Sequence, residues 1–170
     1  MIDKPQAGEY APYYERYISL VDTGNVINLL AELKDSTFTF FNSLPADKAG
    51  YAYAEGKWTI KQVVGHLIDA ERVFAYRLLC FSRGDKNSLP GFDENAFVEY
   101  GGFNNRTLLD LAEEFKAVRE SNLYMLRAIS DEQSKIIGTA SNHPVSVRAL
   151  AYIMAGHELH HLRITKERYL

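Results

Sequence analysis

The sequence predicts an all-α protein built as a four-helix bundle, and three observations support this prediction. Four segments carry apolar residues at helical spacing, no series of residues indicates convincing strands, and one long connection separates the second helix from the third. Helices of this length bury their apolar stripes best against each other, which favours a bundle. A chain of 170 residues is expected to fold as a single domain, residues 1–170.

The first two helices are predicted from stripes and from signals at their ends. The first runs from about Asn25 to Leu44, and Pro45 prevents it from continuing. The second begins after Thr59, a suitable N-cap residue with Gln62 at the capping-box position, and extends towards residue 84.

The third and fourth helices begin at Thr107 and near Ser146, the latter just after Pro144. Between the second and third helices lies a connection of roughly residues 84–106, and connections longer than about 12–15 residues are usually functional or carry local structure. Ahead of all four helices, a tyrosine-rich segment is expected to form a short helical arm that packs on the body; its tyrosines are Tyr10, Tyr13, Tyr14 and Tyr17.

Composition excludes several classes of protein. The single cysteine, Cys80, excludes a disulfide framework and a cysteine-rich zinc module. A net charge of −3 argues against nucleic-acid binding through a basic face. No run of about 18 apolar residues predicts a membrane span, and residues 1–8 lack the pattern of a secretory signal. A cytoplasmic protein that binds neither nucleic acid nor membrane is therefore expected.

Three of the five histidines are predicted to form a metal site. His157 and His161 are four residues apart, so a helix places them on one face. His66 lies on the predicted second helix, on a side that otherwise looks buried, where a metal would satisfy one ring nitrogen. Three imidazoles leave one position for water or substrate, which is typical of catalytic rather than structural sites.

The remaining two histidines rank lower. His160 competes with His161, because residues three apart also share a face, but His161 lies closer to the apolar stripe of its helix. His143, in the segment before Pro144, is interpreted as an exposed loop residue.

The segment 157–161 also matches the pattern H-E-x-x-H, in which zinc peptidases use the glutamate, here Glu158, as general base. The context argues against a peptidase. Only nine residues follow His161, and Ile164 and Glu167 occupy the positions where the extended motif requires glycine and histidine.

The sequence resembles the DinB-like superfamily, in particular its YfiT-type metal-dependent enzymes. The resemblance is carried by Trp58–Glu71 (WTIKQVVGHLIDAE) and Ala155–His161 (AGHELHH), and it extends over about residues 25–169. The histidine triad of that family falls on His66, His157 and His161, the residues that spacing selects.

The resemblance implies an up-down-down-up bundle with the long connection between helices two and three. It also implies a divalent metal, zinc or nickel in the first place, and a homodimer. Known family activities include thiol-S-transferase reactions with bacillithiol and a mycothiol-dependent isomerase. A low-molecular-weight thiol is therefore an expected cofactor, although no residue here indicates a pocket for it.

These observations lead to two hypotheses about function. The first is a metal-dependent thiol-S-transferase or hydrolase acting on a small molecule, with Glu158, Asp93 and Glu94 as candidate proton acceptors. Asp93 and Glu94 are candidates because the long connection could fold over the metal, while Asp69 and Glu71 could orient the ligand histidines. The alternative is a non-catalytic metal-binding or interaction protein, such as a stress-response bundle.

Overall fold

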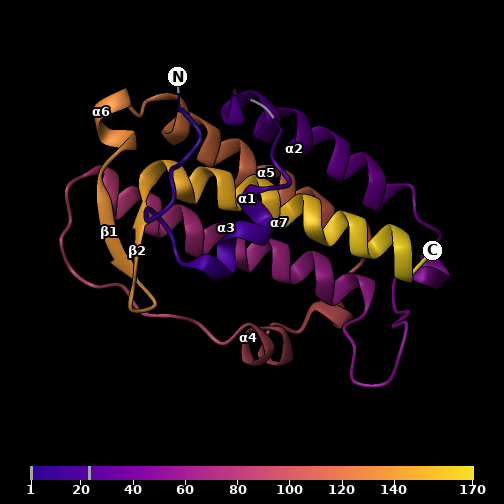
Figure 1. Ribbon diagram of the computed structural model, residues 1–170. Coiled ribbons are helices and arrows are strands. Elements are labelled where there is room, and N and C mark those ends of the chain that lie inside the picture. Colours follow the sequence, from indigo (N-terminus) through magenta and orange to yellow (C-terminus); the bar gives the residue numbers. More distant parts are fainter. Residues whose placement is uncertain (1, 23) are drawn as a thin grey trace.

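Four long helices form a bundle, which confirms the predicted fold class (Figure 1). The computed structural model describes residues 2–22 and 24–170; Met1 and Thr23, which fall inside the predicted domain 1–170, lie outside the described residues. The long helices are α2 (Val26–Asn42), α3 (Ile60–Ser82), α5 (Leu108–Arg127) and α7 (Val147–Arg168). The shorter elements are η1 (Pro12–Tyr14), α1 (Glu15–Ile18), η2 (Ala46–Lys48), α4 (Glu94–Tyr100), η3 (Phe103–Asn105), α6 (Asp131–Ser134), β1 (Ile137–Ala140) and β2 (His143–Ser146).

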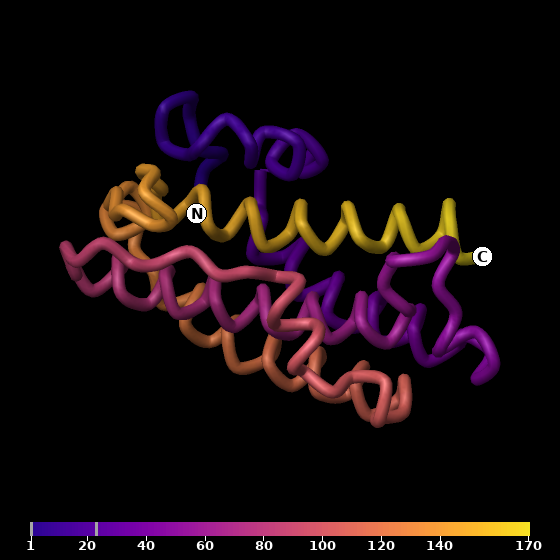
Figure 2. Tube along the Cα trace, turned by 90° about the horizontal axis from the view of Figure 1, so that it is seen from below, coloured from indigo at the N-terminus to yellow at the C-terminus, as the bar shows by residue number. Residues whose placement is uncertain are grey.

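The bundle has the predicted up-down-down-up topology. Helices α2 and α7 run in one direction and α3 and α5 in the other, as the colours along the chain show in Figures 1 and 2. Both α2 and α3 pack on α5 and on α7. Because α3 and α5 are parallel, the chain must travel back along the bundle between them. This return explains why the connection from α3 to α5 is so much longer than the others.

The predicted starts of the long helices are confirmed by their caps. The hydroxyl of Thr59 accepts a hydrogen bond from the backbone N–H of Gln62 at 3.2 Å, and the Gln62 side chain accepts one from the N–H of Thr59 at 2.9 Å. Thr107 and Ser146 cap α5 and α7 in the same way, through the N–H groups three residues on. Because a cap is a contact between residues three apart, sequence alone suffices to predict it.

The long connection carries more structure than the sequence indicated. Leu89 runs alongside β1, donating to the carbonyl of Thr139 at 2.9 Å and accepting from the N–H of Ser141 at 3.0 Å. Helix α4 follows, with Asp93 as its N-cap, and then η3 leads into α5. The connection therefore lies along the bundle as an ordered cover (Figure 1).

The prediction that the chain has no convincing strands is wrong for residues 137–146. Strands β1 and β2 pair in antiparallel register through a tight turn in which Ser141 and Asn142 have φ values of 53° and 65°. The hairpin has no Asn-Gly or Asp-Gly turn, and its strands are only four residues long, so its sequence signal is weak. His143 is exposed, as expected, but it begins β2 rather than lying in a loop.

The tyrosine-rich segment packs on the bundle as predicted. Helix α1 lies on α7, and Tyr17 is buried there. Close contact is possible because α7 has Gly156 at this point: a Cβ there would lie 2.0 Å from the carbonyl oxygen of Tyr17. Farther upstream, Glu9 pairs with Arg148 and accepts a hydrogen bond from Ser146 at 2.8 Å, so the segment is held at the start of α7 as well.

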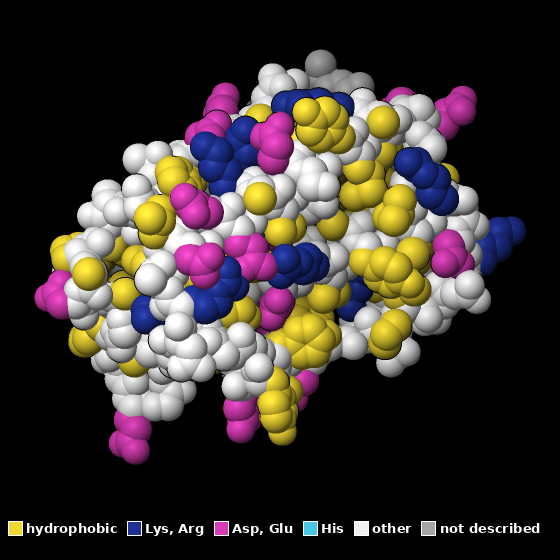
Figure 3. All heavy atoms as spheres, turned by 180° about the vertical axis from the view of Figure 1, so that it is seen from behind, with side chains coloured by type: hydrophobic (Ala, Val, Ile, Leu, Met, Phe, Trp, Pro, Cys, Tyr) yellow, Lys and Arg dark blue, Asp and Glu magenta, His cyan; other side chains and the backbone are white. Residues whose placement is uncertain are grey.

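The outer surface of the bundle is mixed in charge. Figure 3 shows acidic and basic side chains interspersed with small apolar areas over one face, and no histidine is visible among the described residues on that side. Within the described residues, no helix has both the length and the apolar character needed to cross a membrane. His66 and His157 are buried inside the bundle.

Candidate metal centre

The structure brings His66, His157 and His161 together in one cluster. One ring nitrogen from each lies within 4.8 Å of the others, and the Nε2 atoms of His66 and His157 are 3.0 Å apart. Two nitrogens bound tetrahedrally to one zinc at about 2.0–2.1 Å would be roughly 3.3 Å apart. The three imidazoles therefore have a spacing that suits ligands of one divalent ion.

The surroundings favour the neutral form of all three imidazoles. Burial lowers the pKa of His66 to about 4. Burial, together with the neighbouring histidines, also holds the pKa values of His157 and His161 well below the ordinary range. A metal ligand must be deprotonated, so this environment keeps the ring nitrogens available to a metal at neutral pH.

Aromatic side chains surround the histidines and fix their rings. Trp58 packs on His66 and His161, with ring centres 4.8 and 6.5 Å away, and its carbonyl accepts a hydrogen bond from Tyr169 at 2.7 Å. On the other side, Tyr17 lies edge-on to His157 at 5.3 Å. Aromatic contacts of this kind limit how far an imidazole can turn.

A glycine precedes each of the two buried histidines. Gly156 admits α1 next to His157, and Gly65 admits the ring of Phe103 next to His66, where a Cβ would lie 2.3 Å from that ring. Glycine inside a helix costs about 1 kcal/mol relative to alanine, so it usually has a packing reason. The two glycines let neighbouring segments cover the histidines closely.

Two cavities border the cluster, and α4 reaches both. The first, which we call the tyrosine cavity, measures about 280 Å³ and is lined by His66 and His157 together with Glu94. The second, which we call the tryptophan cavity, measures about 230 Å³ and is lined by His161 together with Asn95. Small molecules can therefore approach the histidines from two sides, with the start of α4 between them.

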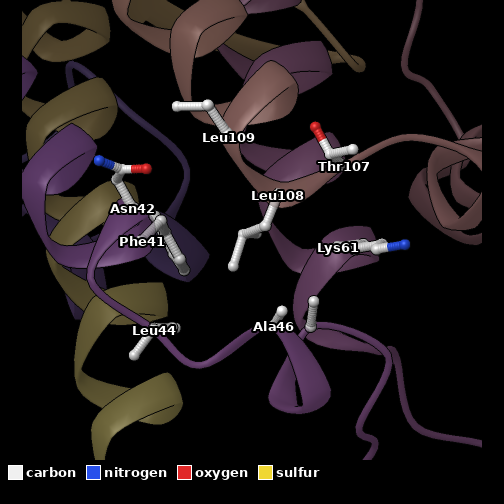
Figure 4. A pocket seen from close by; sticks show the side chains of 9 residues that line it. Phe41, Asn42, Leu44, Ala46, Lys61, Thr107, Leu108 and Leu109 are labelled. Atoms are coloured by element: carbon white, nitrogen blue, oxygen red, sulfur yellow. The ribbon is translucent and has the colours of Figure 1, made fainter.

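A further cavity of about 340 Å³ has no part of the histidine cluster in its lining. Figure 4 shows it between α2, the segment after α2, and the starts of α3 and α5, with mostly apolar side chains such as Phe41 and Leu108 around it. Its polar side chains are those of Asn42, Lys61 and Thr107, and no group that could bind a metal together with the histidines lies among them.

The two lower-ranked histidines do not join the cluster. His160 is partly buried, and its ring lies 5.3 Å from both Tyr17 and His161, but it contributes no nitrogen to the group of three. His143 is exposed on β2. The three histidines that converge are therefore His66, His157 and His161.

Glu158 is fully buried in a cluster of three charged residues and one threonine, which draws one residue from each long helix. Its Oε1 accepts a hydrogen bond from Thr37 of α2 at 2.6 Å, and its Oε2 lies 2.8 Å from Nη1 of Arg119 on α5. Arg119 also binds both carboxylate oxygens of Glu71 on α3, at 2.7 and 2.9 Å. Glu158 is thus held between helices, and this placement does not fit a general base.

The other acidic candidates differ in their positions. Asp93 is exposed and accepts the N–H groups of Asn95 and Ala96 as the N-cap of α4. Glu94 is the acidic candidate that lines a cavity together with cluster histidines. Glu71 does not orient a histidine, because Arg119 binds both of its oxygens.

Sequence reasoning missed the charged cluster and the aromatic residues around the histidines. No local pattern around Arg119 indicates that it is buried and paired, because its partners come from other helices. Gly65 and Gly156 did give one: each is a helix-interior glycine directly before a candidate ligand, which indicates a close neighbour.

Comparison with known proteins supports the fold. A family model described as the DinB superfamily matches residues 29–165. Among solved structures, the chain is similar to YfiT from Bacillus subtilis, described as a probable metal-dependent hydrolase with an unusual four-helix bundle topology. The TM-score is 0.70 at 17% sequence identity, over 96% of this chain and 91% of that one. No curated protein matches the chain.

Proposed function

The chain belongs to the DinB superfamily, and from that membership together with the geometry of the histidines we propose that it is a metal-dependent enzyme acting on a small molecule. His66, His157 and His161 would hold one divalent cation. The observation that carries the proposal is the convergence of their ring nitrogens within 4.8 Å in a setting that keeps them neutral. Zinc and nickel both suit three imidazoles.

A divalent cation at this position would lower the pKa of a bound water or thiol and so supply a nucleophile near neutral pH. The reaction class is hydrolysis or thiol-S-transfer, and a low-molecular-weight thiol would be the second substrate in the latter. The residues of the chain would position the reactants: the substrate would lie between the aromatic walls, and Glu94 in the tyrosine cavity would accept the proton. The cavities beside the histidines favour an enzyme over the non-catalytic alternative, in which a protein side chain would fill that space.

The metal site is tested by counting ions per chain. We expect about one divalent ion per chain in protein purified without chelators, and a small fraction of that in His66→Ala, His157→Ala and His161→Ala. His160→Ala is the matched control, because His160 lies next to the cluster without joining it, and it should keep its metal. Full metal content in the three ligand variants would sink the proposed site.

The role of Glu94 is tested on metal-loaded protein with a panel of esters, amides and electrophiles, with and without added thiols. Once a substrate is turned over, Glu94→Gln should reduce kcat roughly 10²–10⁴-fold with unchanged metal content, which is typical of a lost general base. Glu99→Gln, an exposed change on the same helix, should leave kcat unaltered. An equal loss in both variants would show that the charge of α4, and not this carboxylate, matters.

A further inference from the structure

Three arginines are buried among the described residues, and one of them has no carboxylate beside it. The exposed fractions are 0% for Arg119, 8% for Arg148 and 3% for Arg77. Arg119 is neutralised by two glutamates and Arg148 by Glu9. Within residues 2–22 and 24–170, Arg77 makes no ion pair. A buried guanidinium is normally paired, so its partner is expected from outside the chain.

The contacts of Arg77 leave most of its guanidinium free for such a partner. Its Nη2 donates to the carbonyl of Pro90 at 2.8 Å and to the hydroxyl of Ser141 at 3.1 Å, and both acceptors are neutral. In the described part of the chain, neither Nε nor Nη1 has a hydrogen-bond partner, and neither is sealed from solvent. Nε and Nη1 lie on different edges of the guanidinium, and the paired edges both need Nη2, which is occupied here. A carboxylate or phosphate would therefore accept one charge-assisted hydrogen bond from Nε or from Nη1.

The tyrosine cavity connects this arginine with the candidate metal ligands. Arg77 follows His66 by eleven residues on α3, which is three turns and about 16 Å along the helix, so both face the same side. Arg77, His66 and His157 all line this cavity. The rest of its wall is largely aromatic, and Glu94 lies in it beside the histidines; the aromatic residues are Tyr13, Tyr14, Tyr17, Phe74 and Phe92.

We propose that the tyrosine cavity binds a small organic anion, with its carboxylate or phosphate on Arg77 and an aromatic or apolar body extending towards His66 and His157. The end of this molecule that lies near His66 and His157 would be the end that reacts, and this part of the proposal rests on the proposed function of the histidines. The anion contact itself does not. The cavity of about 280 Å³ lies at the small end of ligand sites, which are roughly 300–1,000 Å³, so the anion is a compact one.

Arg77 also borders a second cavity of about 330 Å³, which Pro90 helps to line and which we call the outer cavity. No cluster histidine lines the outer cavity, and apart from arginines its wall is largely apolar and aromatic. Ser141, which already binds Arg77, lies in the wall of the tyrosine cavity. The inner side therefore offers Ser141 as a second polar group, whereas the second arginine of the outer cavity, Arg72, is already paired with Glu114 at 2.6 Å.

The test compares phenylacetate, its neutral isostere phenylacetamide, and phenyl phosphate, each titrated calorimetrically into the full chain. Metal-free protein is used first, because a bound metal would itself attract carboxylates. Phenylacetamide should bind at least about tenfold more weakly than phenylacetate, as expected for a lost charge-assisted contact. The stronger of phenylacetate and phenyl phosphate identifies which anionic group the site prefers.

Matched variants locate the contact. Arg77→Gln should abolish the preference for the charged probe, Arg77→Lys should retain part of it, and Arg83→Gln, an exposed change directly after α3, should keep it in full. Tyr14→Ala should weaken phenylacetate binding, because Tyr14 lines the tyrosine cavity, whereas Tyr76→Ala in the outer cavity should not.

Equal binding of phenylacetate and phenylacetamide by the unaltered protein would overturn the proposal without reference to any variant. Weaker binding in Tyr76→Ala alone would also overturn it, since the anion would then occupy the outer cavity. Metal content reports separately on the histidines. If the protein binds no metal but still prefers phenylacetate to phenylacetamide, only the metal site fails. If it binds metal but shows no such preference, only the anion site fails.

Discussion

Arg119→Met is expected to destabilise the protein by about 3–5 kcal/mol, the usual effect of removing one partner from a buried ion pair. Arg119 is fully buried and is the cation that faces both Glu71 and Glu158. Without it, two carboxylates remain in the core with no positive charge to compensate them. Chemical unfolding monitored by circular dichroism gives the free energy of unfolding directly.

The loss should grow as the pH rises. Burial raises the pKa of Glu158 even with Arg119 present, and loss of the guanidinium removes a contact that lowers it. When folding raises the pKa of a carboxyl group, ionisation of that group destabilises the folded state. The free energy of unfolding therefore falls as the pH rises towards and above the pKa of the folded state. The gap in stability between the variant and the unaltered protein should therefore be larger at pH 8 than at pH 5.

Two controls isolate the buried charge. Arg72→Met removes an arginine of α3 that pairs with Glu114 at the surface, and it should cost no more than about 1 kcal/mol. Replacing Arg119, Glu71 and Glu158 together with methionine should recover much of the loss, because no unpaired charge remains. A single Arg119→Met variant as stable as Arg72→Met would contradict the prediction.

Gly156→Ala is expected to lift α1 from α7 and to destabilise the protein by about 1–3 kcal/mol, the usual range for overpacking. The added Cβ would lie 2.0 Å from the carbonyl oxygen of Tyr17, and backbone cannot move aside as a flexible side chain can. Replacing glycine by alanine inside a helix would by itself raise the free energy of unfolding by about 1 kcal/mol. We expect the steric clash with Tyr17 to outweigh this gain. Cleavage of residues 9–20 by a protease should become faster.

Two other glycines serve as graded controls. Gly50→Ala meets no atom within 4 Å and should change stability by less than about 0.5 kcal/mol. In Gly65→Ala the added Cβ meets the ring of Phe103, which is a side chain, so the loss of stability should lie between those of Gly50→Ala and Gly156→Ala. If a protease cleaves residues 9–20 no faster in the Gly156→Ala variant than in the unaltered protein, the close approach of α1 to α7 is not needed to hold α1 in place.

The helices and their starts could be predicted because the responsible contacts are local. The capping box of Thr59 and Gln62 and the pairing of His157 with His161 each span at most five residues. The hairpin 137–146 was missed because its turn is an uncommon pair, Ser141 and Asn142. Its stability also depends on Leu89 running alongside, which a local pattern does not reveal.

The site was only partly predictable, and helix α7 shows why. All residues from Val147 to Glu158 are buried, so this part of the helix has no solvent face against which to orient the others. His157 and Glu158 both look like interior residues in the sequence. One faces the cluster of imidazoles and the other faces Arg119, and the neighbouring helices make that difference.

The sequence by itself determined the four helices, their caps, and which three histidines come within 4.8 Å of one another, because helical periodicity and spacing are enough to place residues on faces. Only the tertiary structure decided which carboxylates serve the core and which reach a cavity. It alone showed that Arg77 is buried with no carboxylate beside it in the described part of the chain. The physical reason is that charge pairing and cavity walls depend on side chains from several helices, whose distances no single segment encodes.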